Sequence, residues 1–261
     1  MCLIKFAKNA KPMNLKPAWL LYKYLHTMQF DIHKAMMLNK LNRLSNKLTG
    51  KWLDIGAGDQ PYKKFFANAC EYLTTNTKRH YSTDDIGRLN SMTTYWIEDG
   101  KALPFDDNSL DGVACFQVLS VIDKPEEFFK EMNRVLKPGG KIVLTTDLLY
   151  PVWSSEDRFR HTAFNLRDLS EGNGFIGAVT ESFGGYGAMN YALFMRYLRL
   201  FPELWKRKKT IAKIGSVIPY ILALLLVPLF SLIGLVIFLL EKNSTTYTDF
   251  TFNILLCATK K

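Results

Sequence analysis

The chain has 261 residues, of which 48% are hydrophobic and 22% charged, and its formal net charge is +10. This length suits one large α/β domain with an insertion, and the apolar content excludes a wholly disordered chain. The positive charge predicts an anionic neighbour, either a lipid surface or nucleic acid. The four cysteines show no CxxC spacing and the four histidines form no ligand-spaced pair, so we expect reduced thiols and no metal site.

Residues 1–49 are predicted to form an N-terminal helical cap. Apolar side chains recur at helical spacing between residues 13 and 48, from Trp19 and Leu20 to Leu44 and Leu48. The first 50 residues also carry nine basic side chains against one acidic side chain, Asp31. This pattern predicts one or two amphipathic helices.

Short apolar segments alternate with helical segments after residue 50. Strands are predicted at residues 51–55, 71–75, 93–98, 111–118, 141–146, 175–182 and 250–259, and helices at 61–69, 125–136 and 165–172. Such alternation is typical of βαβ units, in which ligands bind beyond the carboxyl ends of the strands. We therefore predict an α/β fold with a doubly wound, mostly parallel sheet.

The segment from Ile214 to Leu240 interrupts this pattern, because it contains no charged side chain. Split at Pro228, its two arms measure about 21 and 18 Å as helices, less than the roughly 30 Å that a bilayer crossing needs. We predict a helical hairpin that dips into one leaflet at the cytoplasmic face of a membrane. The basic cluster Lys206, Arg207, Lys208 and Lys209 precedes it and favours contact with headgroups over nucleic acid. The alternative is a helical pair buried in a protein partner or in a dimer, which would leave the protein in the cytoplasm.

The sequence Asp54-Ile55-Gly56-Ala57-Gly58 lies between a predicted strand and a predicted helix, where a parallel sheet places a ligand-binding loop. Glycine lets the backbone approach a ligand closely. A carboxylate here repels a pyrophosphate but attracts the sulfonium and ammonium groups of S-adenosylmethionine. For unit charges about 4 Å apart at an effective dielectric near 20, this attraction is roughly 4 kcal/mol. The acidic loop therefore favours S-adenosylmethionine, with a nicotinamide-dependent oxidoreductase or a flavin enzyme as the alternative.

Two further motifs follow this loop in order. They are Asp99-Gly100-Lys101-Ala102-Leu103-Pro104-Phe105 and Arg134-Val135-Leu136-Lys137-Pro138-Gly139-Gly140. With these motifs, residues 50–180 resemble the class I S-adenosylmethionine-dependent methyltransferase family. The resemblance implies a Rossmann-like, seven-stranded sheet whose last strand is antiparallel and inserted within the sheet. The methyltransferase domain would then comprise residues 50–195 and 243–261, with an insertion at 196–242.

The resemblance also implies a cofactor site. Gly56, Ala57 and Gly58 would contact the methionine part of S-adenosylmethionine, Asp54 would orient the loop, and Asp99 with Gly100 would meet the adenine. Phe116 and Gln117 would face the reacting end of the cofactor. Asn76 stands where the family has an acid that binds the ribose, and an amide lacks that acid's charge. Asp84 or Asp85 would be substitutes, and a catalytically inactive membrane adaptor is the alternative function.

The segment from Asp157 to Thr162 resembles a further family motif and supplies candidate catalytic residues. His161 would be the general base for a hydroxyl acceptor, because its pKa can lie near neutrality. Asp157 is a second candidate base, and Arg160 would bind a carboxylate or phosphate of the substrate. The structural alternative is that these side chains only hold the segment to the sheet.

The predicted function is transfer of a methyl group from S-adenosylmethionine to a membrane-associated or lipid-linked acceptor. Candidate acceptors are a polyprenyl-linked sugar of glycan assembly, an isoprenoid quinone and a phospholipid. The first is preferred, because methyltransferases of similar build accompany glycan-assembly enzymes. The expected partners are thus a lipid surface and an amphipathic substrate, with no nucleic acid.

Overall fold

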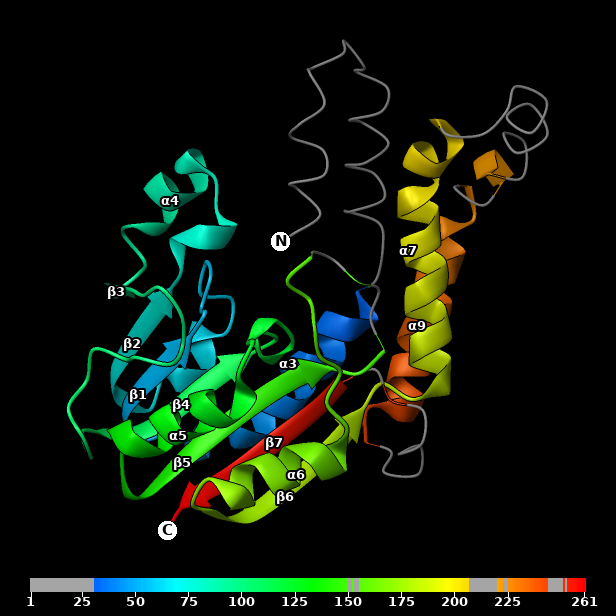
Figure 1. The fold of residues 1–261 in the computed structure, drawn as a ribbon. Helices are drawn as coiled ribbons and strands as arrows, with labels where there is room; N and C mark the ends of the chain where they lie inside the picture. The colour runs from blue at the N-terminus through cyan, green and yellow to red at the C-terminus, as the bar shows by residue number, and fades with distance from the viewer. Residues whose placement is uncertain are drawn as a thin grey trace. The chain divides into compact units, whose positions relative to one another are not determined.

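The computed structural model describes residues 31–149, 152, 155–206, 220–222, 225–243, 251 and 253–261 (Figure 1). The chain divides into two compact units. The sheet unit comprises residues 37–183 and 245–261, and the helical unit comprises residues 1–36 and 184–244. The division lies within α3 (Ile32–Leu44), and the predicted insertion boundary at residue 196 lies inside α7 (Tyr186–Lys206). The helix predictions for residues 13–30 and 214–219, and the side chains of the basic cluster 206–209, lie outside the described part of the chain.

The sheet unit contains seven described strands. They are β1 (Gly50–Ile55), β2 (Ala69–Asn76), β3 (Tyr95–Trp96), β4 (Leu110–Phe116), β5 (Leu136–Asp147), β6 (Phe175–Phe183) and β7 (Asn253–Lys260). Their order in the sheet is β3-β2-β1-β4-β5-β7-β6. Strands β1 to β5 pair in parallel, and β7 lies antiparallel between β5 and β6. The predicted doubly wound sheet with an inserted last strand is confirmed.

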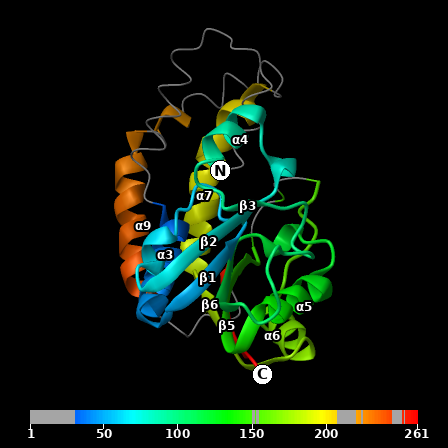
Figure 2. The ribbon, with the colours of Figure 1, turned by 90° about the vertical axis from the view of Figure 1, so that its left-hand side faces the viewer.

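Helices cover both faces of this sheet. Figures 1 and 2 show α5 (Pro125–Val135) and α6 (Ala163–Gly172) on one face and α3 on the other. Phe128 and Phe129 of α5 are fully buried in one core with the strand residues Leu53, Val113 and Leu144. Because side chains alternate along a strand, the residues adjacent to these in sequence project to the opposite face.

Several short elements connect the strands. They are η1 (Ser45–Lys47), η2 (Lys63–Phe66), η3 (Lys78–His80), α4 (Thr83–Leu89) and η4 (Leu119–Val121). The helix predicted at 61–69 is only the 3-10 turn η2, and the strand predicted at 93–98 is only β3. Helix α4 was not predicted. It begins with a capping box between Ser82 and Asp85 and buries only Leu89, so it lacks a periodic apolar face.

The helical unit contains α7 and α9 (Val227–Glu241), which lie side by side in Figure 1. The Glu241 carboxylate accepts hydrogen bonds from the backbone N–H groups of Gly187 (3.0 Å) and Ala188 (3.1 Å) at the start of α7. The ring centroids of Phe194 and Phe230 are 4.9 Å apart. These contacts make α7 an antiparallel partner of α9. In the described part of the chain, no helix is both long enough and apolar enough to span a bilayer.

Candidate functional site

The glycine loop begins where β1 ends, at the carboxyl edge of the sheet. The backbone N–H groups of Gly56 and Ala57 both donate to the carbonyl oxygen of Thr75 in β2, at 2.9 and 3.1 Å. Gly56 and Gly58 have φ angles of +71° and +57°, in the left-handed region that favours glycine. A Cβ on Gly56 would lie 2.6 Å from Cγ2 of Val118, whereas one on Gly58 would come no closer than 3.7 Å to another heavy atom, the Tyr81 hydroxyl. The loop therefore packs closely at Gly56 and leaves space at Gly58.

Asp54 lies beneath this loop and is only 1% exposed. Its Oδ2 accepts a 2.6 Å hydrogen bond from the Tyr72 hydroxyl, and its Oδ1 has no hydrogen-bond partner among the described residues. Burial raises the pKa of Asp54 to about 7, although the hydrogen bond from Tyr72 lowers it. A buried carboxyl with one unpartnered oxygen is suited to a cationic or hydrogen-bond-donating ligand.

Asn76, at the end of β2, holds the glycine loop in place. Its Oδ1 accepts from the Gly58 N–H at 2.8 Å, and its Nδ2 donates to the Gly58 carbonyl (3.3 Å) and to Thr93 Oγ1 (2.8 Å). Both amide hydrogens are thus used and the side chain is buried. In this conformation Asn76 supports the loop, and its predicted contact with the ribose stays a prediction. Of the predicted substitutes, Asp85 accepts a 2.6 Å hydrogen bond from Ser82 Oγ, and Asp84 is exposed.

The predicted adenine-binding residues lie in the turn that follows β3. Asp99 Oδ1 accepts from the Lys101 N–H at 2.9 Å, and its Oδ2 lies 3.3 Å from Lys101 Nζ. The Asp99 side chain is 39% exposed, so it remains accessible to a ligand. A Cβ on Gly100 would lie 2.5 Å from the Phe128 ring. Glycine is therefore required here by packing against α5.

Phe116 and Gln117 lie at the carboxyl end of β4, next to the glycine loop. The Phe116 ring is 4.9 Å from Tyr62 and 6.4 Å from Phe66, measured between centroids, so it packs beneath the segment that follows the loop. Gln117 has a φ of +60°, which is uncommon for a residue with a side chain. Such backbone strain persists only where surrounding contacts fix it.

A polar network surrounds the side chain of Gln117. Its amide satisfies both of its ends when the nitrogen faces Asp147, at 2.5 and 2.9 Å from the two carboxylate oxygens. The amide oxygen then accepts from Thr145 Oγ1 at 3.1 Å, and it can accept from Asn253, 2.8 Å away, once the Asn253 amide is turned so that its nitrogen takes the place of Oδ1. Asp147 and Asn253 are directly paired across β5 and β7, and both are buried. One atom of the Asn253 amide has no hydrogen-bond partner in the described part of the chain.

Asp147 and Asn253 were not among the site residues predicted from the sequence. Asp147 directly follows the strand predicted at 141–146, so the rule that drew attention to Asp54 would have identified it. Asn253 carries no such signal, because its place depends on the register of β7. By alternation, Asp54, Phe116, Asp147 and Asn253 all project from the sheet face opposite the α5–α6 core. The network therefore extends the candidate site across β1, β4, β5 and β7.

The segment with the predicted catalytic residues packs on η4, directly after β4. The N–H groups of Arg158 and Phe159 donate to the Ser120 carbonyl at 2.9 and 3.2 Å. Arg160 donates from Nη1 and Nη2 to the two carboxylate oxygens of Asp157, and the Nη2 hydrogen bond measures 2.6 Å. This hydrogen bonding raises the pKa of Arg160, and the charge of Asp147 contributes to the shift. The structure thus pairs Arg160 with Asp157. The predicted role of Arg160 in binding a carboxylate or phosphate of the substrate stays a prediction.

His161 is 5% exposed and its Nδ1 lies 2.7 Å from Asn165 Oδ1. Because Asn165 presents an oxygen, Nδ1 carries the proton and Nε2 is left as an acceptor. Nε2 has no hydrogen-bond partner among the described residues. Burial lowers the pKa of His161, so the neutral ring predominates at neutral pH. This state suits a general base, provided that an acceptor reaches Nε2.

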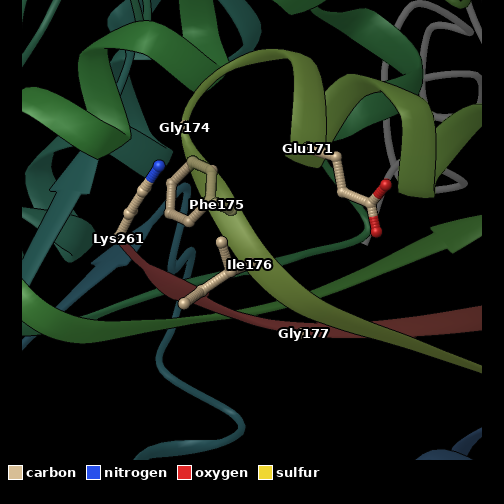
Figure 3. Close-up of a pocket in the computed structure, with 6 residues that line it drawn as sticks. All are labelled: Glu171, Gly174, Phe175, Ile176, Gly177 and Lys261. Atoms are coloured by element: carbon tan, nitrogen blue, oxygen red, sulfur yellow. The ribbon is translucent and has the colours of Figure 1, made fainter.

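A separate hollow of about 440 Å³ lies at the other edge of the sheet. It is lined by Glu171, Gly174, Phe175, Ile176, Gly177 and Lys261, where β6 begins and β7 ends (Figure 3). Because β7 is antiparallel to β5, this hollow is at the amino edge of the parallel strands. It therefore lies opposite the edge that carries the glycine loop.

Comparisons with known proteins cover this same region. A family model described as a methyltransferase domain matches residues 53–144. A demethylmenaquinone methyltransferase of Staphylococcus haemolyticus is 30% identical over 122 residues, which are 44% of this chain and 51% of the relative. An uncharacterised methyltransferase of Mycobacteroides abscessus is 32% identical over 106 residues, 39% of each chain. The chain spans about half or less of the length of the curated relatives it matches.

Solved structures support the fold. A S-adenosylmethionine-dependent methyltransferase from Mesorhizobium loti superposes with a TM-score of 0.51 at 14% identity, over 88% of this chain and 100% of the other. A methyltransferase from Thermotoga maritima has a TM-score of 0.50 at 16% identity, over 88% and 91% of the two chains. At these identities the likeness concerns the fold alone.

Proposed function

Because the chain belongs to the class I S-adenosylmethionine-dependent methyltransferase family, we propose that it transfers a methyl group from S-adenosylmethionine to a small-molecule acceptor. The observation that carries the proposal is Asp54, a buried carboxyl with an unpartnered oxygen beneath a glycine loop. A pyrophosphate would be repelled there, which counts against the nicotinamide alternative.

The residues present fit the cofactor. S-adenosylmethionine supplies an electrophilic methyl group on a sulfonium centre. The space at Gly58 would admit its methionine part, and the charge of ionised Asp54 would favour its cationic groups. Asp99 would accept a hydrogen bond from the adenine amino group, since its side chain is partly exposed. Phe116 and Gln117, next to the loop, would border the reacting end.

The acceptor would bind beside this point, over the ends of β4, β5 and β7. Gln117 holds Asp147 in a fixed position, and Asp147 together with Asn253 offers hydrogen-bonding capacity to an acceptor that carries a hydroxyl or amino group. His161 Nε2 would accept the proton of a hydroxyl acceptor. Asp157 and Arg160 would be positioning residues: their ion pair would hold the segment that carries His161 against η4. Alignment of the acceptor with the methyl group would supply most of the rate.

We further propose that the acceptor is amphipathic or lipid-linked and that the protein works at the cytoplasmic face of a membrane. The apolar helix α9 supports this proposal, and so do relatives named as demethylmenaquinone methyltransferases. An isoprenoid quinone is therefore the first acceptor to test, ahead of a polyprenyl-linked sugar. The second candidate function is a membrane adaptor without turnover. The observation that favours it is Asn76, an amide where the family has a ribose-binding acid, with both of its hydrogens already used.

Calorimetric titration of the full chain with S-adenosylmethionine and S-adenosylhomocysteine tests the proposal. Binding of both, lost in Asp54→Ala, is the expected result. Transfer of isotope-labelled methyl groups is then measured with demethylmenaquinone in detergent micelles and with phosphoethanolamine as a water-soluble comparison. Absence of binding by either cofactor form would favour the adaptor.

A further inference from the structure

The helical unit carries many exposed apolar side chains in its second half. Between residues 221 and 240, eleven large hydrophobic side chains are exposed, with Leu225 at 70% and Leu240 at 75%. They are Ile221, Leu222, Leu225, Leu226, Leu229, Leu232, Ile233, Leu235, Val236, Leu239 and Leu240. Soluble proteins rarely leave an apolar patch of this extent uncovered unless it binds something.

The exposed residues of α9 lie on one side of the helix. At about 100° per residue, the positions from Leu229 to Leu240 that are exposed cover about half of the circumference. The opposite side carries Val227, Gly234 and Glu241, spaced seven residues apart, and faces α7. The exposed side therefore forms an outward face, which we define as residues 229, 232, 233, 236, 239 and 240.

The outward face is not needed for the packing of α9 on α7. A Cβ on Gly234 would lie 2.3 Å from Cζ of Tyr191, so glycine lets the Tyr191 ring lie directly against the helix. Phe230 meets Phe194, and Glu241, the single charged residue of α9, is used at the start of α7. These contacts lie on the inner side of α9. Because Glu241 is on that side, the outward face has no charged group.

Length and charge identify the occupant of this face. Helix α9 has 15 residues and measures about 22 Å, less than the roughly 30 Å of a hydrocarbon core, so it is too short to cross a membrane. In the sequence, four consecutive basic residues at 206–209 begin at the last residue of α7, and Lys242 follows α9. Basic residues beside an apolar helix are typical of proteins that bind anionic lipid surfaces.

We propose that the outward face of α9 lies in the interfacial layer of an anionic membrane, with the helix axis parallel to the surface. This differs from the hairpin predicted by sequence, whose arms were to dip into one leaflet. The membrane would bring the proposed methyltransferase to an amphipathic acceptor. Only this link to the acceptor rests on the proposed function.

Flotation of the full chain with vesicles of phosphatidylcholine and phosphatidylglycerol tests the proposal. The wild type is expected to float with the vesicles, and less so with phosphatidylcholine alone. The variant with Leu232→Glu and Val236→Glu is expected to lose binding about tenfold or more, because charges enter the outward face. The control is Phe164→Glu, which alters a side chain that is 76% exposed on α6 and should leave flotation unchanged.

Two further measurements identify the other outcomes. The proposal is overturned if the wild type stays with the soluble fraction. It is also overturned if the wild type floats and the double variant floats to the same extent. A large fall in the melting temperature of the double variant would show that protein covers the face, either residues 1–30 or a second copy, and sedimentation would identify the copy. Cofactor titration of the same samples is independent of flotation, so loss of the proposed function would be distinguished from loss of this surface.

Discussion

The Tyr72 hydroxyl donates a 2.6 Å hydrogen bond to Oδ2 of Asp54, across the paired strands β1 and β2. The donor is neutral, and the other carboxylate oxygen has no partner among the described residues. Burial therefore dominates and places the pKa of Asp54 at about 7. The charge of the candidate cofactor site consequently changes within the physiological pH range.

Cofactor affinity should depend on pH through Asp54. A cation binds the ionised carboxylate better, so the dissociation constant for S-adenosylmethionine should fall up to about tenfold per pH unit between pH 5 and 7 and then level off. Calorimetry at constant ionic strength measures this slope. Asp54→Asn serves as the control, because it should bind weakly and without the slope. A wild-type affinity that does not change with pH would contradict the prediction.

Protein stability should show the opposite dependence. The pKa of Asp54 is about 7 in the folded chain, above the ordinary value of 3.8. Protonated Asp54 therefore contributes its full stabilisation below pH 3.8, and this stabilisation is lost as the pH rises to about 7. Asp54→Asn removes this loss. The free energy of unfolding of the variant, relative to the wild type, should therefore increase by about 2–4 kcal/mol between pH 4 and 8. Urea denaturation at the two pH values measures it, and a constant difference would count against a buried, protonated Asp54.

Tyr72→Phe should shift the cofactor-binding profile to higher pH. The variant loses the hydrogen bond that lowers the pKa of Asp54, so ionisation should require a higher pH than in the wild type. The same titration series gives the inflection point. An unchanged inflection would mean that the Tyr72 hydroxyl does not act on Asp54 in solution.

Gly56→Ala should destabilise the chain more than Gly139→Ala. Both glycines have similar positive φ angles, +71° and +77°, so both substitutions carry about 1 kcal/mol of backbone strain. Only at Gly56 would the new Cβ meet a neighbour, 2.6 Å from Val118, whereas nothing lies within 4 Å at Gly139. We expect an additional loss of about 1–3 kcal/mol for Gly56→Ala. Urea denaturation compares the variants, and equal losses would contradict the packing at Val118.

Asp147→Asn should impair acceptor use but not cofactor binding. The change removes the charge that the Gln117 amide contacts but keeps an acceptor oxygen, so this hydrogen bond should weaken from about 1.5–3 kcal/mol to about 0.5–1.5 kcal/mol. Methyl transfer to an identified acceptor should fall about tenfold or more, with S-adenosylmethionine affinity nearly unchanged. Asp168→Asn, an exposed position on α6, is the matched control. A parallel loss of cofactor affinity would place Asp147 in the cofactor site instead.

The sequence alone was sufficient for much of the sheet. The strand from Lys51 to Ile55 and the strand that ends near Phe116 are short apolar segments in a chain that alternates strands with helices, so their parallel orientation followed from general rules. The antiparallel, inserted position of β7 came from the family resemblance. The glycine loop was located correctly because a strand and a turn are adjacent in sequence there.

The rest of the site depends on contacts between distant segments. Gln117 and Asn253 are 136 residues apart, and their contact requires the register of β7 against β5. The pairing of α9 with α7 was also not predicted. The apolar segment was divided at Pro228, and its two halves were expected to pair with each other as a hairpin. The partner residues on α7, including Tyr191 and Phe194, lie about 40 residues earlier in an amphipathic segment that no motif marks.

The position of β7 has a consequence for biosynthesis. Because β7 separates β5 from β6, those two strands have no mutual pairing to form while residues 253–260 are still inside the ribosome. Until then the growing chain carries two unfilled strand edges, which are templates for aggregation. Completion of the sheet is therefore expected only after residues 253–260 have left the ribosome, and a nascent chain stalled before residue 253 should depend on chaperones.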